Sequence, residues 1–257
     1  MRSMHLTEIG ACLRFHDLAG AEPAGVYLPG LASAGSADFP ETAAQPPLRD
    51  RRWIVVDLLG AGFSDRPAGF DYRMESHAVT VAALLDKLGL ADCTVVASSM
   101  GGAVAILLAA SRPDLVGRLV LAEPALDPGR GRLSPYLSDL TEQQYVASGH
   151  RQLLRMLAEM DSSGEYVGTF AAALRTADPA AVHRCSRSLR TQRTPSLRET
   201  LYALPMPRSV LVGSRSAVDT EVLGRNGVDV YEVPDAGHSM MDDNPVGFAA
   251  AIAAAGS

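Results

Sequence analysis

The sequence has 257 residues, of which 47% are hydrophobic and 20% charged, so it can bury one substantial core and is not a disordered chain. The formal net charge of −6, with no short run rich in Lys or Arg, excludes a protein that binds nucleic acid through a basic surface. Three cysteines, far apart at positions 12, 93 and 185, exclude a disulfide framework and a CxxC metal or redox motif.

The chain up to about residue 90 predicts short strands and one helix. The first 30 residues alternate between apolar and polar positions around the turn-forming stretch AGAEPAG, which indicates strands. Residues 53–56 are an apolar run that predicts a buried parallel strand. Residues 77–88 carry apolar side chains at helical spacing, Val79 among them, and predict a helix. The N-terminal stretch MRSMHLTEIG lacks the apolar core of a signal peptide, so we expect a cytoplasmic protein.

The stretch VVASSMGGAVAILLAA, residues 95–110, joins two apolar halves through two serines and two glycines. The uncharged run is long enough to cross a membrane. Its β-branched first half and its alanine- and leucine-rich second half instead predict a strand, a sharp turn and a helix inside a buried core, without membrane association. A serine at such a turn exposes its hydroxyl, so Ser99 is the predicted nucleophile and Ser98 is expected only to pack. The alternative is a serine that closes a buried turn.

The second half of the chain predicts strands on either side of a helical insertion. GRLVLAEPAL, residues 117–126, is an apolar run that indicates another buried strand. Helical segments then follow without a convincing strand, until RSVLVGS and VDVYEVPDAGH restore the strand pattern. We therefore expect a core made of residues 1–127 and 208–257, with residues 128–207 forming a helical cap. Arginines at positions 175–198 of the cap are more typical of a solvated helix face than of an anion site.

A hydroxyl nucleophile needs a base, and His238 follows the last predicted strand at the same sheet edge as Ser99. The backbone N–H groups of Met100, at the start of a helix, and of Leu31, in the loop PGLASAGS, are the predicted oxyanion donors. The same loop is also compatible with an ordinary turn. No histidine pair has metal-ligand spacing, and GAGFSD at residues 60–65 lacks the third glycine of a dinucleotide motif, so we expect no metal and no cofactor.

The order of serine and C-terminal histidine, together with LPG, DLLGAGFSDRP and ASSMGG, resembles the α/β-hydrolase family. The resemblance implies an eight-stranded, mostly parallel sheet, a helical cap inserted after strand six, and a cofactor-free Ser-His-acid triad in which Ser99 and His238 match the family's positions. Two small departures occur. Ala97 replaces the first glycine of the serine motif, and Pro29 replaces a histidine in the oxyanion loop, where the backbone donor is retained.

The acid of the triad is a larger departure from the family pattern. Most relatives carry it after strand seven in a G-x-x-D sequence, but residues 213–216 of this chain read GSRS. Some relatives place the acid after strand six, and Glu123 in LVLAEPALD occupies that position. Asp219 and Asp127 lie within a few residues of the two sites and remain alternatives. We expect Glu123 to orient His238 because triads are defined by geometry and not by sequence order.

The sequence therefore predicts a serine hydrolase that cleaves a carboxylic ester or thioester of a small organic substrate through an acyl-enzyme. One alternative is a family member that uses the same residues for C–C bond hydrolysis, lyase chemistry or acyl transfer. A second is a non-catalytic member that keeps the pocket and only binds a ligand. We expect the apolar side chains of RQLLRMLAEM, residues 151–160 of the cap, to set the acyl size.

Overall fold

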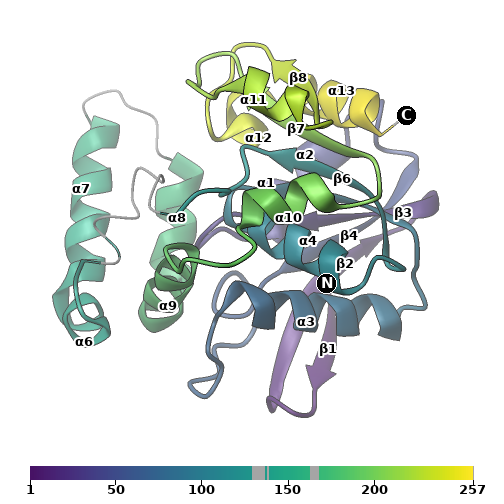
Figure 1. Cartoon of the computed structure of the whole chain (residues 1–257). Coiled ribbons are helices and arrows are strands. Elements are labelled where there is room, and N and C mark those ends of the chain that lie inside the picture. The colour runs from purple at the N-terminus through teal and green to yellow at the C-terminus, as the bar shows by residue number, and fades with distance from the viewer. Residues whose placement is uncertain (129–136, 138, 163–167, 257) are drawn as a thin grey trace.

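The computed structural model describes residues 1–128, 137, 139–162 and 168–256. The strands are β1 (Arg2–Leu6), β2 (Ala11–Leu18), β3 (Ala21–Leu28), β4 (Arg51–Asp57), β5 (Cys93–Ser98), β6 (Val116–Ala122), β7 (Arg208–Gly213) and β8 (Asp229–Val233). They form one eight-stranded sheet in the order β1-β2-β4-β3-β5-β6-β7-β8 (Figure 1). β2 pairs antiparallel with β1 and β4, and every other neighbouring pair is parallel. This order confirms the predicted α/β fold with a mostly parallel eight-stranded sheet.

The sheet is covered by helices on both faces, as a parallel sheet with two apolar faces requires. The helices are α1 (Gly35–Asp38), α2 (Pro40–Ala43), α3 (Met74–Lys87), α4 (Met100–Ser111), α6 (Glu142–Gln144), the π-helix η1 (Tyr145–Gly149), α7 (His150–Ser162), α8 (Gly168–Thr176), α9 (Pro179–Leu189), α10 (Leu197–Ala203), α11 (Thr220–Arg225), α12 (Met240–Asp243) and α13 (Pro245–Ala255). One core cluster joins the sheet to α3, α4 and α10, and a second joins its other face to α2, α12 and α13 (Figure 1).

Helix α3 begins three residues before the predicted start, and its buried face differs from the expected one in one residue. Leu84 and Leu85 are fully buried, but the side chain of Val79 is 68% exposed. The buried face continues instead through His77, Ala78 and Val81. Apolar spacing alone did not distinguish an isolated surface valine from a core position.

The described part of the segment between β6 and β7 contains helices and no strand, and α7 and α8 lie to one side of the sheet (Figure 1). Helices α7, α8 and α9 share an apolar cluster with Ala32 of the loop after β3; the helices contribute Leu153, Leu157, Leu174 and Val182 to it. Helix α10 differs, because Leu201 belongs to the cluster beneath the sheet. The division into a core and a cap of residues 128–207 stays a prediction. In the described part of the chain, no helix is both long enough and apolar enough to span a membrane.

Candidate active site

The turn between β5 and α4 holds Ser99 in a backbone conformation that L-residues rarely adopt. Its φ is 50° and its ψ is −112°, and its side chain is half-buried. A Cβ at Gly101 would collide with the carbonyl oxygen of Leu28, so only glycine allows α4 to start so close to β3. Ser98 is buried, as expected of a packing residue. The turn thus presents Ser99 and not Ser98 at the carboxyl edge of the sheet.

Glu123 follows β6, the strand next to β5, and its backbone also has a positive φ, of 39°. Its side chain is 9% exposed and receives a hydrogen bond from each of two segments. The Gly213 N–H donates to Oε1 over 3.1 Å, and Nδ1 of His238 lies 2.8 Å from Oε2. Burial acts to raise the pKa of Glu123, but hydrogen bonds from His238, from the Ser216 side chain and from the Gly213 N–H outweigh it and hold that pKa below its usual range. The side chain is therefore a carboxylate.

His238 lies in the loop after β8, with a side chain that is 58% exposed. A carboxylate only accepts hydrogen bonds, so the contact with Glu123 places the proton on Nδ1 and leaves Nε2 as the acceptor. Among the hydrogen bonds formed by the described residues, none joins the Ser99 hydroxyl to His238. Such contacts are often long in ligand-free enzymes and tighten when substrate binds.

The main chain connects the serine turn to the acid loop. The Ser99 N–H donates to the carbonyl oxygen of Ala122 over 2.9 Å, and the Ala125 N–H donates to the carbonyl oxygen of Ser99 over 3.0 Å. Ala122 and Ala125 are close neighbours of Glu123 in the chain. The backbone positions of Ser99 and Glu123 therefore depend on one another.

The two alternative acids lie elsewhere. Asp127 forms an ion pair with Arg198 of α10 at 2.7 Å. Asp219 is the N-cap of α11, where its side chain accepts a hydrogen bond from the Val222 N–H. Of the three carboxylates, Glu123 is the one that the structure brings against His238. Its catalytic role stays a prediction.

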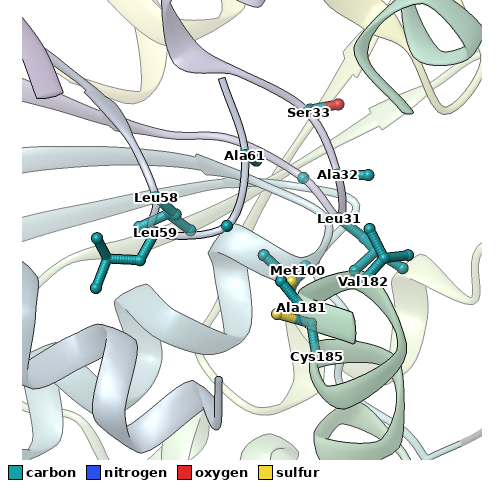
Figure 2. Close-up of a pocket in the computed structure, with 12 residues that line it drawn as sticks. Leu31, Ala32, Ser33, Leu58, Leu59, Ala61, Met100, Ala181, Val182 and Cys185 are labelled. Carbon is teal, nitrogen blue, oxygen red and sulfur yellow. The ribbon is translucent and has the colours of Figure 1, made fainter. Parts of the chain in front are cut away.

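The predicted oxyanion donors, Leu31 and Met100, border the same narrow pocket (Figure 2). Among the described residues, neither of their N–H groups has an acceptor within the chain. The other lining residues are Gly30, Ala32, Ser33, Leu58, Leu59, Gly60, Ala61, Ala181, Val182 and Cys185. The pocket has a volume of about 10 Å³, which is close to the space one water molecule occupies. It is apolar, and no charged side chain is among these lining residues.

Helix α9 of the predicted cap contributes three residues to the pocket lining, and no feature of the sequence indicated this. Residues 151–160 were expected to set the acyl size, but none of them lines the pocket. Leu153 and Leu157 of α7 instead belong to the apolar cluster that α7 shares with α8, α9 and Ala32. Figure 2 shows Ala181, Val182 and Cys185 of α9 beside Leu31 and Met100.

Asp38 of α1 is a second ionisable group near this edge of the sheet that the sequence did not single out. Burial, followed by the nearby carboxylates of Asp242 and Asp57, raises the pKa of Asp38 to about 7, against a smaller opposing effect of Ser33. The burial of Asp38 is not apparent from the sequence, because the residue lies in the polar-looking stretch GSADFP. Within the described residues, no group of three or more His, Cys, Asp or Glu side chains could hold a metal ion.

A family model described as the alpha/beta hydrolase fold matches residues 26–167, more than half of the chain. The chain therefore belongs to the α/β-hydrolase family. It is 36% identical over 107 residues to a 2-hydroxy-6-oxo-2,4-heptadienoate hydrolase of Pseudomonas putida, an alignment that spans 41% of this chain and 38% of that relative. Among solved structures, an esterase from Exiguobacterium antarcticum superimposes with a TM-score of 0.78 at 20% identity, covering 99% of both chains. An enol-lactonase from Burkholderia xenovorans LB400 does so with a TM-score of 0.80, also at 20% identity and 99% coverage of both.

Proposed function

We propose that this chain is a serine hydrolase that cleaves a carboxylic ester or thioester of a small organic substrate through an acyl-enzyme. The observation that carries the proposal is the 2.8 Å contact between His238 Nδ1 and Glu123 Oε2, beside a serine held at positive φ. A histidine oriented by a buried carboxylate, with its other nitrogen free, is the base that a serine nucleophile needs.

In the proposed reaction, Nε2 of His238 takes the proton of the Ser99 hydroxyl as its oxygen attacks the substrate carbonyl. Glu123 stabilises the imidazolium that forms, and the free N–H groups of Leu31 and Met100 donate to the oxyanion. His238 then gives the proton to the leaving alcohol or thiol, which leaves an ester on Ser99. Water, deprotonated by the same Nε2, attacks this ester and releases the carboxylic acid and the free serine.

The position of the pocket indicates which part of the substrate it would hold. The leaving group has to lie next to His238, on the β8 side of Ser99, because that histidine protonates it. The pocket lies on the other side, between the loops that follow β3 and β4, since it contains Leu31 and Leu58. It therefore suits the acyl group. Its small apolar lining favours a short, uncharged acyl group.

Hydrolysis of a C–C bond is the second candidate, because the Pseudomonas putida relative is named as the hydrolase of an oxo-dienoate. A substrate of that kind carries a carboxylate, which proteins usually bind with Arg or Lys. None of the residues that line the described pocket is cationic. We therefore place ester or thioester cleavage first.

Covalent labelling with a fluorophosphonate probe tests the proposal. We expect the wild-type chain to be labelled at Ser99 and to hydrolyse short p-nitrophenyl esters. Ser99→Ala should abolish both, and Ser98→Ala, the matched control one residue away, should keep both within about threefold, since Ser98 is a packing residue. An unlabelled wild-type protein that still binds an ester would identify a ligand-binding member and contradict the proposal.

A further inference from the structure

The turn after β7, residues 213–216, contacts both Glu123 and the loop that carries His238. The Gly213 N–H and the Ser216 side chain hydrogen-bond with Glu123. On the opposite side of this turn, the Ser214 N–H donates to the carbonyl oxygen of Val233, the last residue of β8, over 3.0 Å. The turn is therefore packed between the two partners of the His238–Glu123 contact.

The approach of this turn to the histidine loop is unusually close. A Cβ at Gly213 would collide with the carbonyl oxygen of Ala236, so a side chain there would push the loop away. The Arg215 N–H also donates to the same carbonyl oxygen over 2.9 Å. Ala236 is two residues before His238, so any displacement of the turn is transmitted to the histidine.

An ion pair joins the two segments at the same place. Nη2 of Arg215 lies 2.9 Å from Oδ2 of Asp243 in α12. That carboxylate oxygen also accepts a hydrogen bond from the Gly237 N–H over 2.7 Å. Asp243 is thus bound to the β7 turn by its ion pair and to the residue just before His238 by its hydrogen bond.

We propose that Arg215 and Asp243 are positioning residues whose ion pair, acting through the Gly237 N–H, fixes the His238 loop in register with Glu123. The pair lies at the surface, with side chains 60% and 20% exposed, so it adds little to global stability. Its effect is local, because it acts on the residue just before His238, whose own side chain is largely exposed. A displacement of a catalytic group by about 1 Å can cost about 100-fold in rate.

The proposal has a direct structural readout in the tautomer of His238. While Glu123 accepts from His238, the neutral ring carries its proton on Nδ1. Ring ¹⁵N chemical shifts at alkaline pH report this tautomer, and a His238→Gln variant assigns the signals. We expect Arg215→Met and Asp243→Asn each to convert a measurable fraction of the ring to the Nε2–H tautomer, because the loosened loop breaks the contact with Glu123.

The kinetic readout rests on the proposed function. In both variants we expect kcat for a short ester to fall about tenfold while KM changes by less than twofold, and Arg215→Lys to recover part of the loss. The two substitutions change the local charge in opposite senses. A direct electrostatic effect on the site would move kcat in opposite directions and vanish at high salt, whereas loss of positioning lowers kcat in both.

Arg225→Met is the control for loss of a surface ion pair, because Arg225 pairs with Glu221 within the helix that follows the same turn and does not contact the His238 loop through that pair. It should leave both the tautomer and kcat unchanged. The proposal is overturned if Arg215→Met and Asp243→Asn behave like this control, or if their kcat values move in opposite directions. If the wild-type chain is not labelled by fluorophosphonate, the proposed function fails, but the tautomer measurement still decides the role of the ion pair.

Discussion

Replacement of Glu123 by glutamine is the sharpest test of the proposed triad. The Gly213 N–H and His238 each hydrogen-bond with a different oxygen of the carboxylate. A glutamine of the same shape has one acceptor oxygen, and its NH₂ group faces whichever donor remains. If the glutamine oxygen accepts from His238, the buried Gly213 N–H is left without a partner; if it accepts from Gly213, the NH₂ group faces Nδ1 of His238 and can only donate to it. If the imidazole ring of His238 stays in place, its proton moves from Nδ1 to Nε2. Nε2 can then no longer act as a base.

The expected loss is large because the histidine is held in the wrong tautomer. In serine proteases, the equivalent carboxylate-to-amide change lowers kcat by about 10⁴. We expect Glu123→Gln to lower kcat by about 10³–10⁴, equivalent to about 4–5.5 kcal/mol of activation free energy. The assay is steady-state hydrolysis of a p-nitrophenyl ester, with thermal unfolding to show that the variant is folded.

Asp219→Asn is the control for this experiment, since an asparagine can still cap α11. Its kcat should stay within about twofold of the wild-type value. A Glu123→Gln enzyme with kcat within tenfold of wild type would refute the assignment of the acid. A crippled Asp219→Asn enzyme would move the assignment to the loop after β7.

Three further predictions concern the surroundings of the site. Val182→Ala should raise kcat/KM for butanoyl relative to acetyl esters by about tenfold, because it widens the pocket by about two methyl groups; an unchanged ratio would place the acyl group elsewhere. Asp127→Asn should lower the free energy of unfolding by about 0.5 kcal/mol, measured in urea, and leave kcat unchanged, since it breaks the ion pair with Arg198 on a part of the chain away from His238. Asp38 has a pKa of about 7 when folded and about 3.9 when unfolded, so the wild type should lose stability as pH rises from about 4 to 7. Asp38→Asn should remove this slope, gaining about 2.6 kcal/mol relative to wild type between pH 5 and pH 8, and the same change of unfolding free energy with pH in both proteins would contradict it.

The sequence predicted those parts of the molecule whose signals are local. The β5–α4 turn is an example, because the residues on each side of it have a clear intrinsic preference. A β-branched run favours a strand, an alanine-rich run favours a helix, and two serines and two glycines separate the runs. The same logic placed His238 at the edge of the sheet. Glu123 was assigned from its position after a buried strand, and the structure indeed brings it to His238. Their roles in catalysis remain to be measured.

The parts that the sequence did not predict depend on contacts between distant segments. Part of the pocket lining comes from α9, about 80 residues from Met100, and helical periodicity predicts which face of a helix is apolar but not what that face contacts. The same limit applies to α7, which the sequence predicts to set the acyl size, although its apolar face packs in a cluster with α8, α9 and Ala32 and does not line the pocket. The burial of Asp38 and the ion pair between Arg215 and Asp243 are likewise products of tertiary packing.

The position of the acid on the strand next to the serine strand has a mechanical consequence. Ser99 and Glu123 both have strained backbones, and each strained residue is held by the other's segment, through the Ser99 N–H to Ala122 and the Ala125 N–H to Ser99. β5 and β6 pair in register up to Ser98 and Ala122, so the sheet itself fixes the distance between the two loops. The serine and the acid thus form a rigid unit, whereas His238 is held on a separate and more exposed loop. Because the acid does not come from the β7 turn, that turn is free to hold the histidine loop through Arg215. How precisely the three groups are positioned therefore depends mainly on His238. The contacts that restrain its loop contribute more to the activity than their exposure at the surface suggests.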